Sequence, residues 1–346
     1  MRLPAEWERQ SGVQMTWPDE STPWYELPEV QRCYARIAEA ILRREPLLMV
    51  TADREACRAR LHEIASLDGL KMDWDLLRMV EAPINDTWAR DHGGIAVFGG
   101  DGEKYLYDFV FNGWGLKFAS DLDNQITRNI FYQNVFEEDV MGVDMRPFVL
   151  EGGSIDTDGK GTLMATSECL LSVNRNEYLS QDEVEGELKQ AFGLERILWL
   201  DHGGIVGDDT DSHVDILARF APDDTILYTS CEDDSDENYV PLREMEEQLR
   251  TFRTPEGKPY RLIPLPLPEP MYLDGYRLPA SYANFLVING AVLVPGAGGP
   301  LDGVAKLQIA LAFPGREIEV IDCRPLLSGH GGLHCVTMNY PEGFIL

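Results

Sequence analysis

Short apolar segments alternate with helix-forming segments along the whole chain, and this alternation is the feature that most constrains the fold. The predicted strands cover residues 46–52, 94–98, 105–111, 148–150, 162–166, 196–200, 214–221, 225–229 and 318–322. Residues 284–294 predict a β-hairpin, because two apolar runs flank an Asn289-Gly290 turn. Alternation of this kind is typical of α/β proteins and predicts that class.

Five segments have apolar residues at helical spacing: 29–45, 54–65, a segment that starts at Ser180, 238–253 and 301–313. Glu183 stands three residues after Ser180, which is the signature of a capping box. A unit of strand, Gly- or Asp-rich loop, second strand and helix recurs about every 60 residues, although the units share little sequence. The acidic segment 231–238 and the proline-rich segment 261–270 are short enough to be loops. We therefore expect a single domain over residues 1–346.

The chain of 346 residues is strongly acidic, with 59 Asp and Glu against 30 Lys and Arg and a formal net charge of −29. Nucleic acid and anionic membrane surfaces are therefore disfavoured as partners, because both bind clustered basic side chains. A negative field concentrates small cations, so a cationic ligand stays open beside the simpler view that the acidity only maintains solubility. The hydrophobic fraction of 44% is enough for a large core.

The first residues contain no apolar leader segment, and no stretch approaches the roughly 18 apolar residues of a membrane-spanning helix. The six cysteines form no CxxC pair and are expected to be free thiols. Together these features predict a cytoplasmic protein. Its oligomeric state stays open, with a homo-oligomer allowed.

Chemically active side chains gather in four loops beside predicted strands: 85–91, 151–154, 207–215 and 331–335. A lone cysteine is usually an inert small apolar residue, and Cys335 becomes a nucleophile only if a base such as His lies nearby. His213 is the better partner, because His334 adjoins Cys335 and on a strand would point to the opposite face. On a strand, His213 and Asp215 would share one face.

A cysteine, a histidine and the carboxylates of Asp91, Glu151 and Asp215 suit a planar delocalised cation such as guanidinium. The alternative, that each of these acids only caps a turn, stays open for any single residue. The acidic loop 232–237 allows a calcium site, although a solvated loop is the simpler interpretation. EF-hand, HExxH and phosphate-binding loop patterns are absent, so neither a metal nor a nucleotide cofactor is predicted.

Seven motifs occur in order along nearly the whole chain: LPAEWERQSGVQMTWP, NDTWARDHG, FNGWG, LEGGSIDTDGKGTLMATSECLLS, GDDTDSHVDILARF, ASYANFLVINGAVLVP and GGLHCVTMNYP. Together they resemble the agmatine deiminase family, a branch of the guanidino-group-modifying enzymes. That group also includes bacterial peptidylarginine deiminase and, more distantly, arginine deiminase. The resemblance implies a pentein fold, an α/β propeller of five pseudo-symmetric ββαβ units in one domain.

The resemblance also implies roles for individual residues. Cys335 matches the nucleophile and His213 the general acid and base, while Asp91 and Asp215 match the carboxylates that hold the guanidinium. Glu151 matches a glutamate that orients the histidine.

Three further residues match positions around the substrate in that family. Trp88 would form a wall against the guanidinium or the alkyl chain, and Asp209 would meet a distal amine. Asn284 matches a polar position near the site. The sequence departs from the family pattern at Gly94, Asp156 and His330, and the last two are expected to alter the substrate channel.

The function implied is hydrolysis of agmatine to N-carbamoylputrescine and ammonia through an S-alkylthiouronium on the cysteine, without metal or organic cofactor, in putrescine biosynthesis. Two alternatives stay open. One is a peptidylarginine or free-arginine deiminase on the same scaffold. The other, from a different class, is a non-catalytic acidic protein that binds calcium or another cation.

Overall fold

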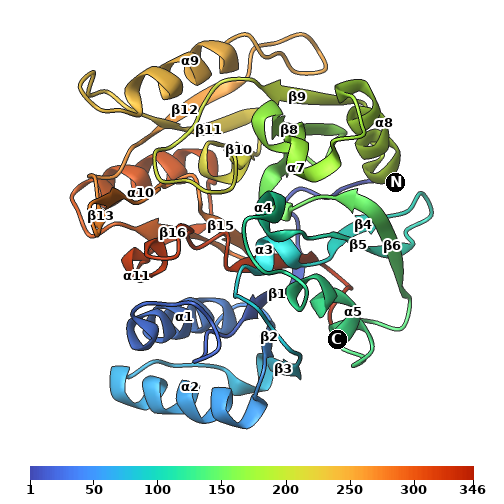
Figure 1. Ribbon diagram of the computed structural model, residues 1–346, viewed down its shortest axis with the longest axis vertical. Coiled ribbons are helices and arrows are strands. Elements are labelled where there is room, and N and C mark those ends of the chain that lie inside the picture. Colours follow the sequence, from blue (N-terminus) through green and yellow to red (C-terminus); the bar gives the residue numbers. More distant parts are fainter.

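The computed structural model describes all residues, 1–346, and confirms the mixed α/β class (Figure 1). Four three-stranded sheets share one pattern, an antiparallel pair followed by a parallel pair. Their strands are β4 (Ile95–Phe98), β5 (Lys104–Val110) and β6 (Val140–Val149); β7 (Ile155–Thr157), β8 (Thr162–Thr166) and β9 (Arg196–Leu200); β10 (Ala218–Ala221), β11 (Thr225–Ser230) and β12 (Arg261–Pro266); and β15 (Leu286–Ile288), β16 (Ala291–Gly296) and β17 (Glu317–Asp322).

A fifth sheet joins the two ends of the chain. Its order is β18 (Thr337–Pro341), β1 (Gln10–Thr16), β2 (Leu47–Thr51) and β3 (Leu77–Glu81), with β18 antiparallel to β1 and the other pairs parallel. A small hairpin is formed by β13 (Tyr272–Leu273) and β14 (Tyr276–Arg277). The repeated unit expected from the sequence therefore exists as five sheets.

Long helices lie at the periphery of the molecule and the sheets lie inside them (Figure 1). The long helices are α1 (Leu27–Leu42), α2 (Arg54–Asp68), α8 (Gln181–Phe192), α9 (Tyr239–Leu249) and α10 (Leu301–Ala312). The short ones are α3 (Ala89–His92), α4 (Gly113–Leu116), α5 (Ile126–Phe131), α6 (Ser167–Leu170), α7 (Val173–Asn176) and α11 (Arg324–Leu327), with 3-10 turns η1 (Trp74–Leu76), η2 (Asp123–Gln125), η3 (Gly152–Ser154) and η4 (Val214–Ile216). Each long helix begins within two residues of its predicted start, and the four with a predicted end finish within four residues of it.

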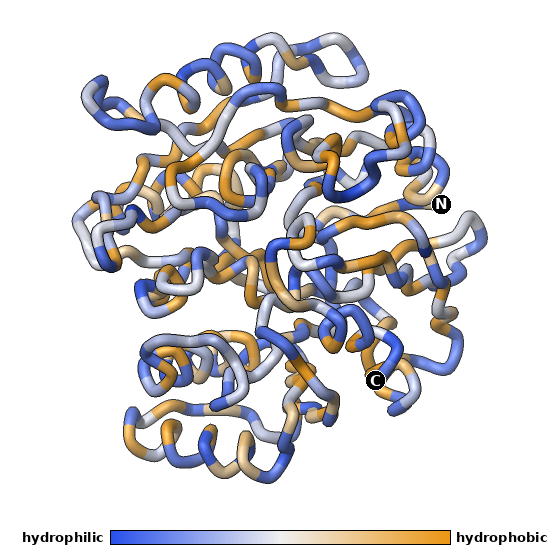
Figure 2. Tube along the Cα trace, viewed as in Figure 1, coloured by the Kyte–Doolittle hydropathy of each residue, from blue (hydrophilic) through white to orange (hydrophobic).

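Helix α1 shows why these segments fold as they do. Val30, Tyr34, Ile37 and Ile41 recur at helical spacing and are fully buried. The capping box predicted at Ser180 and Glu183 is present at the start of α8. Apolar residues are concentrated in the inner strands and polar residues in the outer helices and loops (Figure 2).

The prediction for the proline-rich segment is wrong in part, because Arg261–Pro266 forms strand β12 rather than a loop. Pro264 and Pro266 stand two residues apart, so their missing N–H groups face the same side of the strand. β12 is an edge strand, where a proline need not donate to a neighbour. The acidic segment 231–238 is a loop, as predicted.

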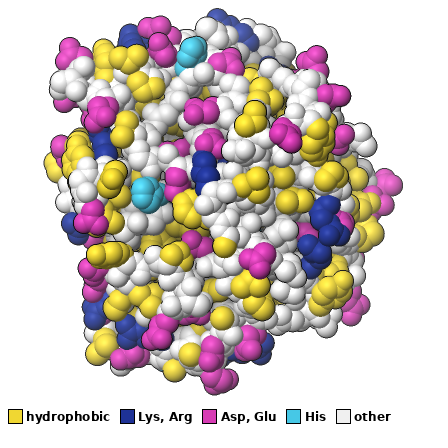
Figure 3. All heavy atoms as spheres, viewed as in Figure 1, with side chains coloured by type: hydrophobic (Ala, Val, Ile, Leu, Met, Phe, Trp, Pro, Cys, Tyr) yellow, Lys and Arg dark blue, Asp and Glu magenta, His cyan; other side chains and the backbone are white.

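None of the helices is both long and apolar enough to cross a bilayer. Acidic side chains are spread over the face shown in Figure 3, with basic groups among them. The net charge of the surface therefore does not by itself indicate a binding site among the 59 acids. The candidate site is sought among the acids that the fold buries.

Candidate active site

Three of the four polar loops predicted from the sequence line a cavity of about 220 Å³, and the fourth, residues 151–154, contacts Asp91 through the backbone N–H of Gly153. Asp91 enters from α3 and Cys335 from the turn before β18, and both line the cavity. Its lining is Pro23, Asp86, Trp88, Asp91, Trp114, Phe118, Asp209, Thr210, Ser328, Gly329, His330, Gly331 and Cys335. No Lys or Arg is among these residues, so the cavity is suited to a cation.

Asp91 is held by two donors from different elements. The indole Nε1 of Trp114 donates to its Oδ2 at 2.9 Å, and the backbone N–H of Gly153 donates to its Oδ1 at 3.1 Å. Burial raises the pKa of Asp91, and although the charge of His213 opposes this, the result is about 6. The carboxylates of Asp215 and Glu151 also raise it.

Asp215 has the opposite titration behaviour. Burial alone would raise the pKa of Asp215, but its hydrogen bond to His334 and the charge of that ring outweigh burial and hold the pKa below its usual value. The Nδ1 atom of His334 lies 2.7 Å from Asp215 Oδ2, and Asn284 Nδ2 donates to the same oxygen at 3.2 Å. The other oxygen, Oδ1, is buried and has no partner, so it is free to accept from a ligand.

Three polar side chains pack closely against Gly153, which has no side chain of its own. A Cβ at this position would lie 2.7 Å from His213 Nδ1, 2.8 Å from Asp91 Oδ1 and 3.1 Å from Asp215 Oδ2. Both ring nitrogens of His213 lack a hydrogen-bond partner although the residue is 1% exposed. Unpaired buried polar atoms are costly, so a polar ligand that reaches the ring of His213 would be stabilised by it.

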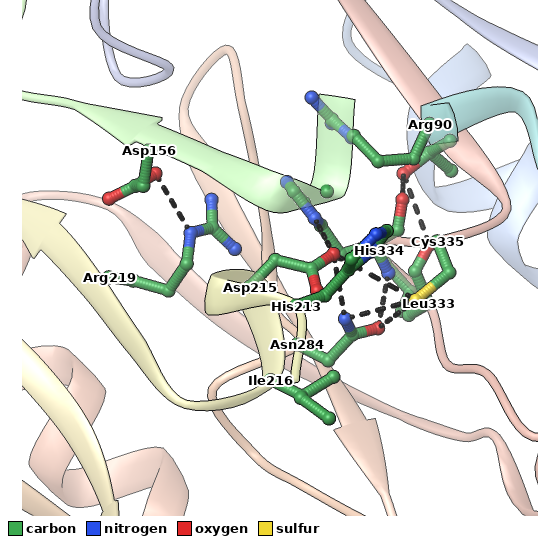
Figure 4. Close-up of polar contacts among 12 residues, drawn as sticks. Arg90, Asp156, His213, Asp215, Ile216, Arg219, Asn284, Leu333, His334 and Cys335 are labelled. Carbon is green, nitrogen blue, oxygen red and sulfur yellow. Dashed lines mark hydrogen bonds and ion pairs between the residues drawn. The ribbon is translucent and has the colours of Figure 1, made fainter. Parts of the chain in front are cut away.

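Cys335 lies against the same carboxylate. Its Sγ is 3.8 Å from Asp215 Oδ2, and Asn284 Nδ2 donates to Sγ at 3.2 Å (Figure 4). Burial raises the pKa of the Cys335 thiol well above its ordinary value, and the negative charges of Asp215 and Asp91 raise it further. The empty site therefore holds a neutral thiol, and a bound cation would favour its ionisation.

His213 is a cation in the empty site. Burial would lower its pKa, but the charges of Asp91, Cys169 and Glu151 outweigh burial and raise the pKa well above the ordinary value. Asp91 Oδ1 is 3.7 Å from His213 Nδ1. A protonated imidazole beside a thiol and two carboxylates is able to act as a general acid.

Glu151 contacts Arg175 directly and has no hydrogen bond to His213. Arg175 Nε donates to both carboxylate oxygens at 3.0 Å, and both side chains are fully buried. Ligand atoms of Glu151, Cys169 and His213 lie within 4.8 Å of one another, an arrangement that is sometimes found around metals. Since the guanidinium of Arg175 already neutralises Glu151, the group fits an ion pair better than a metal site.

Trp88 and Asp209 both line the cavity, as expected for residues beside the substrate. Trp88 packs on Trp24 with ring centroids 5.2 Å apart, and Gly331 lies directly against its ring, where no larger residue fits. Burial raises the pKa of Asp209 to about 6, and the charge of His330 opposes this.

Asp86 is a carboxylate in the cavity that our sequence analysis did not identify. Burial raises its pKa to about 6, and the neighbouring charge of Asp209 contributes to the rise. Its place in NDTWARD, five residues before Asp91, was a usable signal. Trp114 and Arg175 were also missed, because their contacts to Asp91 and Glu151 join residues distant in sequence.

Three expectations for this region are wrong. His213 and Asp215 do not lie on a strand, because Val214–Ile216 is the 3-10 turn η4 with His213 preceding it. His334 and Cys335 do not lie on a strand, because residues 333–336 form a turn, and although the two residues line different cavities the ring of His334 still reaches Asp215. Asp156 does not alter the substrate cavity, since it pairs with Arg219 at 3.0 Å away from the lining.

His330 does line the cavity, as the departure from the family pattern suggested. Its backbone has a φ of 66°, a conformation that favours glycine. Its Nδ1 lies 2.8 Å from the carbonyl oxygen of Gly207. In the acidic loop 232–237, two of the carboxylates contact neighbouring protein groups: Asp236 pairs with Arg277, and Asp233 accepts a hydrogen bond from Ser235.

Comparison with known proteins agrees with this geometry. Residues 2–341 match the model of the Porphyromonas-type peptidyl-arginine deiminase family. The chain belongs to this family. Agmatine deiminase of Stutzerimonas stutzeri is 32% identical over 367 residues, which covers 99% of this chain and 96% of that protein.

Solved structures of this deiminase family are similar over the whole length. A Porphyromonas gingivalis protein provisionally described as an arginine deiminase is 49% identical, with a TM-score of 0.92 and coverage of 100% of this chain and 99% of that one. A cysteine-to-serine variant of the agmatine deiminase of C. jejuni, with substrate bound, is 34% identical, with a TM-score of 0.87 and coverage of 99% and 97%. A DDAH from Pseudomonas aeruginosa, 12% identical over 96% of this chain with a TM-score of 0.52, shares the fold.

The position of Gly153 gives a direct test of this site. In Gly153→Ala the new methyl would occupy the point where His213, Asp91 and Asp215 converge. We expect steady-state turnover of a guanidino substrate to fall at least about 100-fold, because a displacement of about 1 Å is enough for such a loss.

Gly186→Ala is the matched control. Gly186 lies inside α8, and a Cβ there would meet nothing within 4 Å. Alanine favours a helix interior by about 1 kcal/mol, so this variant keeps its turnover and its melting temperature does not fall. Full activity in Gly153→Ala would show that the substrate does not use this point.

Proposed function

We propose that the chain is an agmatine deiminase, which hydrolyses the guanidinium group of agmatine to N-carbamoylputrescine and ammonia. It is thus a hydrolase of C–N bonds in linear amidines. The observation that carries the proposal is the cavity itself, where a cysteine and Asp91 occur with two further carboxylates, Asp86 and Asp209, and no Lys or Arg. Agmatine is positive at both ends, and each end finds an acid in such a cavity.

The proposal includes the finer architecture of the fold. The five sheets with their repeated antiparallel and parallel pairs are the five blades of an α/β propeller, in one domain over residues 1–346. The likeness to DDAH supports this arrangement. A propeller of this kind would place the four polar loops at one end of its central axis, which would explain why they lie close together.

Binding is the first step of the proposed mechanism. Asp91 and Asp215 hold the guanidinium through paired charge-assisted hydrogen bonds, and Asp215 Oδ1 is unpaired and ready to accept. The cation cancels the negative field that keeps Cys335 protonated, so the thiol ionises when substrate binds. Trp88 forms a wall of the cavity and Asn284 donates to the sulfur.

The chemistry then proceeds in two stages. The Cys335 thiolate attacks the guanidinium carbon, and the His213 imidazolium gives its proton to the departing nitrogen, which leaves as ammonia. The remaining S-alkylthiouronium is attacked by a water from which neutral His213 removes a proton. The C–S bond then breaks, so that guanidinium and water yield a ureido product and ammonium. Glu151, held in place by its ion pair with Arg175, helps to raise the pKa of His213 and so favours the imidazolium.

A specific observation favours a second candidate, a deiminase of free or peptidyl arginine. The 49% identical protein of Porphyromonas gingivalis has the provisional description arginine deiminase. Arginine has an α-carboxylate, however, and the cavity offers it no Lys or Arg. Lys117 Nζ, which donates to the backbone carbonyl of Asp209 beside the cavity, is already paired with Asp211 at 2.5 Å. Agmatine, which lacks the carboxylate, is therefore preferred.

The biological setting is part of the same proposal. N-carbamoylputrescine leads to putrescine, so the enzyme would serve polyamine synthesis. All six cysteines are unpaired and five of them are buried, which suits a reducing cytoplasm.

Ammonia release with agmatine, arginine and a blocked arginine peptide, measured side by side, tests the proposed substrate. We expect turnover of agmatine to exceed turnover of the other two by at least about 100-fold in kcat/KM, since pairing of the distal charge contributes about 1.5–3 kcal/mol and the carboxylate of arginine is repelled. Turnover confined to arginine or to the peptide would contradict the proposal.

Replacement of the nucleophile is a second test. Cys335→Ala should lower turnover of agmatine more than about 1,000-fold, because no covalent path remains. Cys231→Ala is the control, since Cys231 is the one cysteine that is not buried and lies away from the cavity.

Thiol labelling adds a check that needs no turnover. A haloacetamidine carries a guanidinium-like group, and we expect it to label Cys335 before the more exposed Cys231. Equal labelling of all six cysteines would favour a non-catalytic cation-binding protein.

A third test concerns the distal amine. Asp209→Asn should raise the KM for agmatine about tenfold with little change in kcat, which corresponds to about 1.4 kcal/mol of lost binding. Because the pKa of Asp209 is about 6, its charge is lost as pH falls through that value. The KM of the wild type should therefore rise below about pH 6, and this rise should be weaker in the variant.

An alkylguanidine without the amine is the control for this variant. Its KM should be the same in the wild type and in Asp209→Asn, because Asp209 then has no charge to bind. An equal rise in KM for both substrates would show that Asp209 acts on the guanidinium end or on the fold.

A further inference from the structure

A second, smaller cavity of about 70 Å³ lies behind the candidate active site. The two cavities share no lining residue, but consecutive residues face opposite sides: Arg90 lines the second cavity and Asp91 the first, and His334 and Cys335 divide in the same way. Glu6 from the N-terminal segment also lines the second cavity. Arg90 and His334, on the side of the second cavity, are therefore adjacent in the sequence to the proposed catalytic residues Asp91 and Cys335.

The ring of His334 joins the two sides. Its Nδ1 lies 2.7 Å from Asp215 Oδ2, and its Nε2 lies 2.8 Å from Glu6 Oε2. The histidine is 2% exposed, and its place between Asp215 and the strands around it is visible in Figure 4. Each ring nitrogen thus has a carboxylate oxygen at hydrogen-bond distance.

This geometry determines the charge of the ring. A neutral imidazole donates from only one nitrogen, and its other nitrogen would direct a lone pair at a carboxylate oxygen. The pKa of both carboxyl groups, Glu6 and Asp215, lies below its usual value although burial opposes this. Carboxylate oxygens accept, so a ring that bonds to both of them donates from both nitrogens.

Glu6 is itself held by several elements. Arg219 on β10 donates to its Oε2 at 2.9 Å, and the backbone N–H of Val287 on β15 donates to its Oε1 at 2.7 Å. Arg90 of α3 lies 3.7 Å from Oε2. Glu6 is thus an anchor that fixes Nε2 of His334 and so the orientation of the ring.

All charged groups that face His334 are accounted for in this arrangement. Glu6 and Asp215 contact its ring directly, and Arg219 and Arg90 reach it through Glu6. Asp156 on β7 pairs with Arg219 on its far side. Cys335, His213 and Asp91 lie beyond Asp215.

Asp91 serves as a comparison, because it is a buried carboxylate without a contact to His334. Both carboxylates are buried beside the same space near Gly153, yet the pKa of Asp91 is about 6 whereas that of Asp215 lies below its usual value. The difference is that Asp215 has an imidazolium at 2.7 Å, and Asp91 has only neutral donors in direct contact. An opposite charge at this distance favours the ionised carboxylate.

We propose that Glu6 and His334 are positioning residues for Asp215: Glu6 keeps His334 protonated on both nitrogens, and His334 keeps Asp215 ionised with Oδ1 directed at the guanidinium. Neither residue touches the substrate. The inference deepens the proposed deiminase function and rests on it for its kinetic consequences, whereas the charge of His334 belongs to the resting protein. It assigns a role to an N-terminal glutamate that is 329 positions before the proposed nucleophile in the sequence, from residue 6 to residue 335.

Two substitutions of His334 separate its two contacts. In His334→Gln the side-chain amide reaches the Nε2 position, so it keeps Glu6 and loses Asp215. In His334→Asn the amide reaches the Nδ1 position, so it keeps a neutral donor to Asp215 and loses Glu6. We expect the pKa of Asp215 to rise by about 1–3 in His334→Gln and by less in His334→Asn.

The readout is the pH profile of kcat/KM for agmatine. When Asp215 titrates in the same range as Asp91, the acid limb becomes steeper and moves to higher pH, because two carboxylates must then ionise. At the pH where the wild type has half its maximal kcat/KM, His334→Gln should retain at most about half of the wild-type value, because about half of Asp215 is protonated when its pKa equals that pH. Glu6→Gln should move the limb in the same direction.

Glu8→Gln is the matched control. Glu8 lies on the same N-terminal segment and pairs with Arg2 at 2.5 Å, with no contact to His334. The acid limb of the kcat/KM profile should be unchanged in Glu8→Gln. An unchanged limb in His334→Gln, or an equal shift in Glu8→Gln, would overturn the proposal and leave His334 a purely structural role.

The resting protein gives an independent measurement. The ¹⁵N resonances of the six histidines of the full chain, with His334 assigned by its loss in His334→Asn or His334→Gln, report protonation of each ring nitrogen. We expect His334 to be doubly protonated at pH 8 in the wild type, and a neutral ring would overturn the proposal. If the protein shows no turnover of agmatine, the proposed function fails while this result still decides the charge of His334.

Discussion

The site depends on one constraint, that carboxylates buried in an apolar α/β fold must each receive a cation or a set of donors. A buried unpaired charge is costly enough to unfold a domain of ordinary stability. Glu151 is paired with Arg175, and Glu6 with Arg219 and His334. These pairs neutralise the buried charges of Glu151 and Glu6. Asp91 instead lines the cavity, and Oδ1 of Asp215 is left without a partner.

The unequal treatment of the two carboxylates has a chemical consequence. Asp215 has His334 at 2.7 Å and a pKa below its usual value, whereas Asp91 receives neutral donors and His213 at a greater distance. In the empty site Cys335 is neutral and His213 is cationic, because negative charge surrounds both. A cationic ligand changes this balance in the required direction. The site is thus selective for substrate charge before any contact with the rest of the ligand is considered.

Much of the fold was predictable because it depends on local patterns. The apolar periodicity of α1, the capping box at Ser180 and the hairpin around Asn289-Gly290 are each contained within a few residues. β12 was not predictable, since its prolines suggest a loop unless the strand is known to lie at an edge. β18 and β1 also needed the fold, because their pairing joins the two ends of the chain. Edge position and long-range pairing are properties of the assembled sheet.

By itself the sequence determined the α/β class, the four polar loops and the chemical types gathered in them, because residue identity and short-range periodicity carry that information. The order of the motifs was enough to indicate the deiminase family. Only the tertiary structure decided which groups are charged and which oxygen is free. The contacts of Glu6 with His334 and of Arg175 with Glu151 decide this, and they join segments far apart in the chain. Protonation follows from burial and from such neighbours, and neither exists before the chain folds.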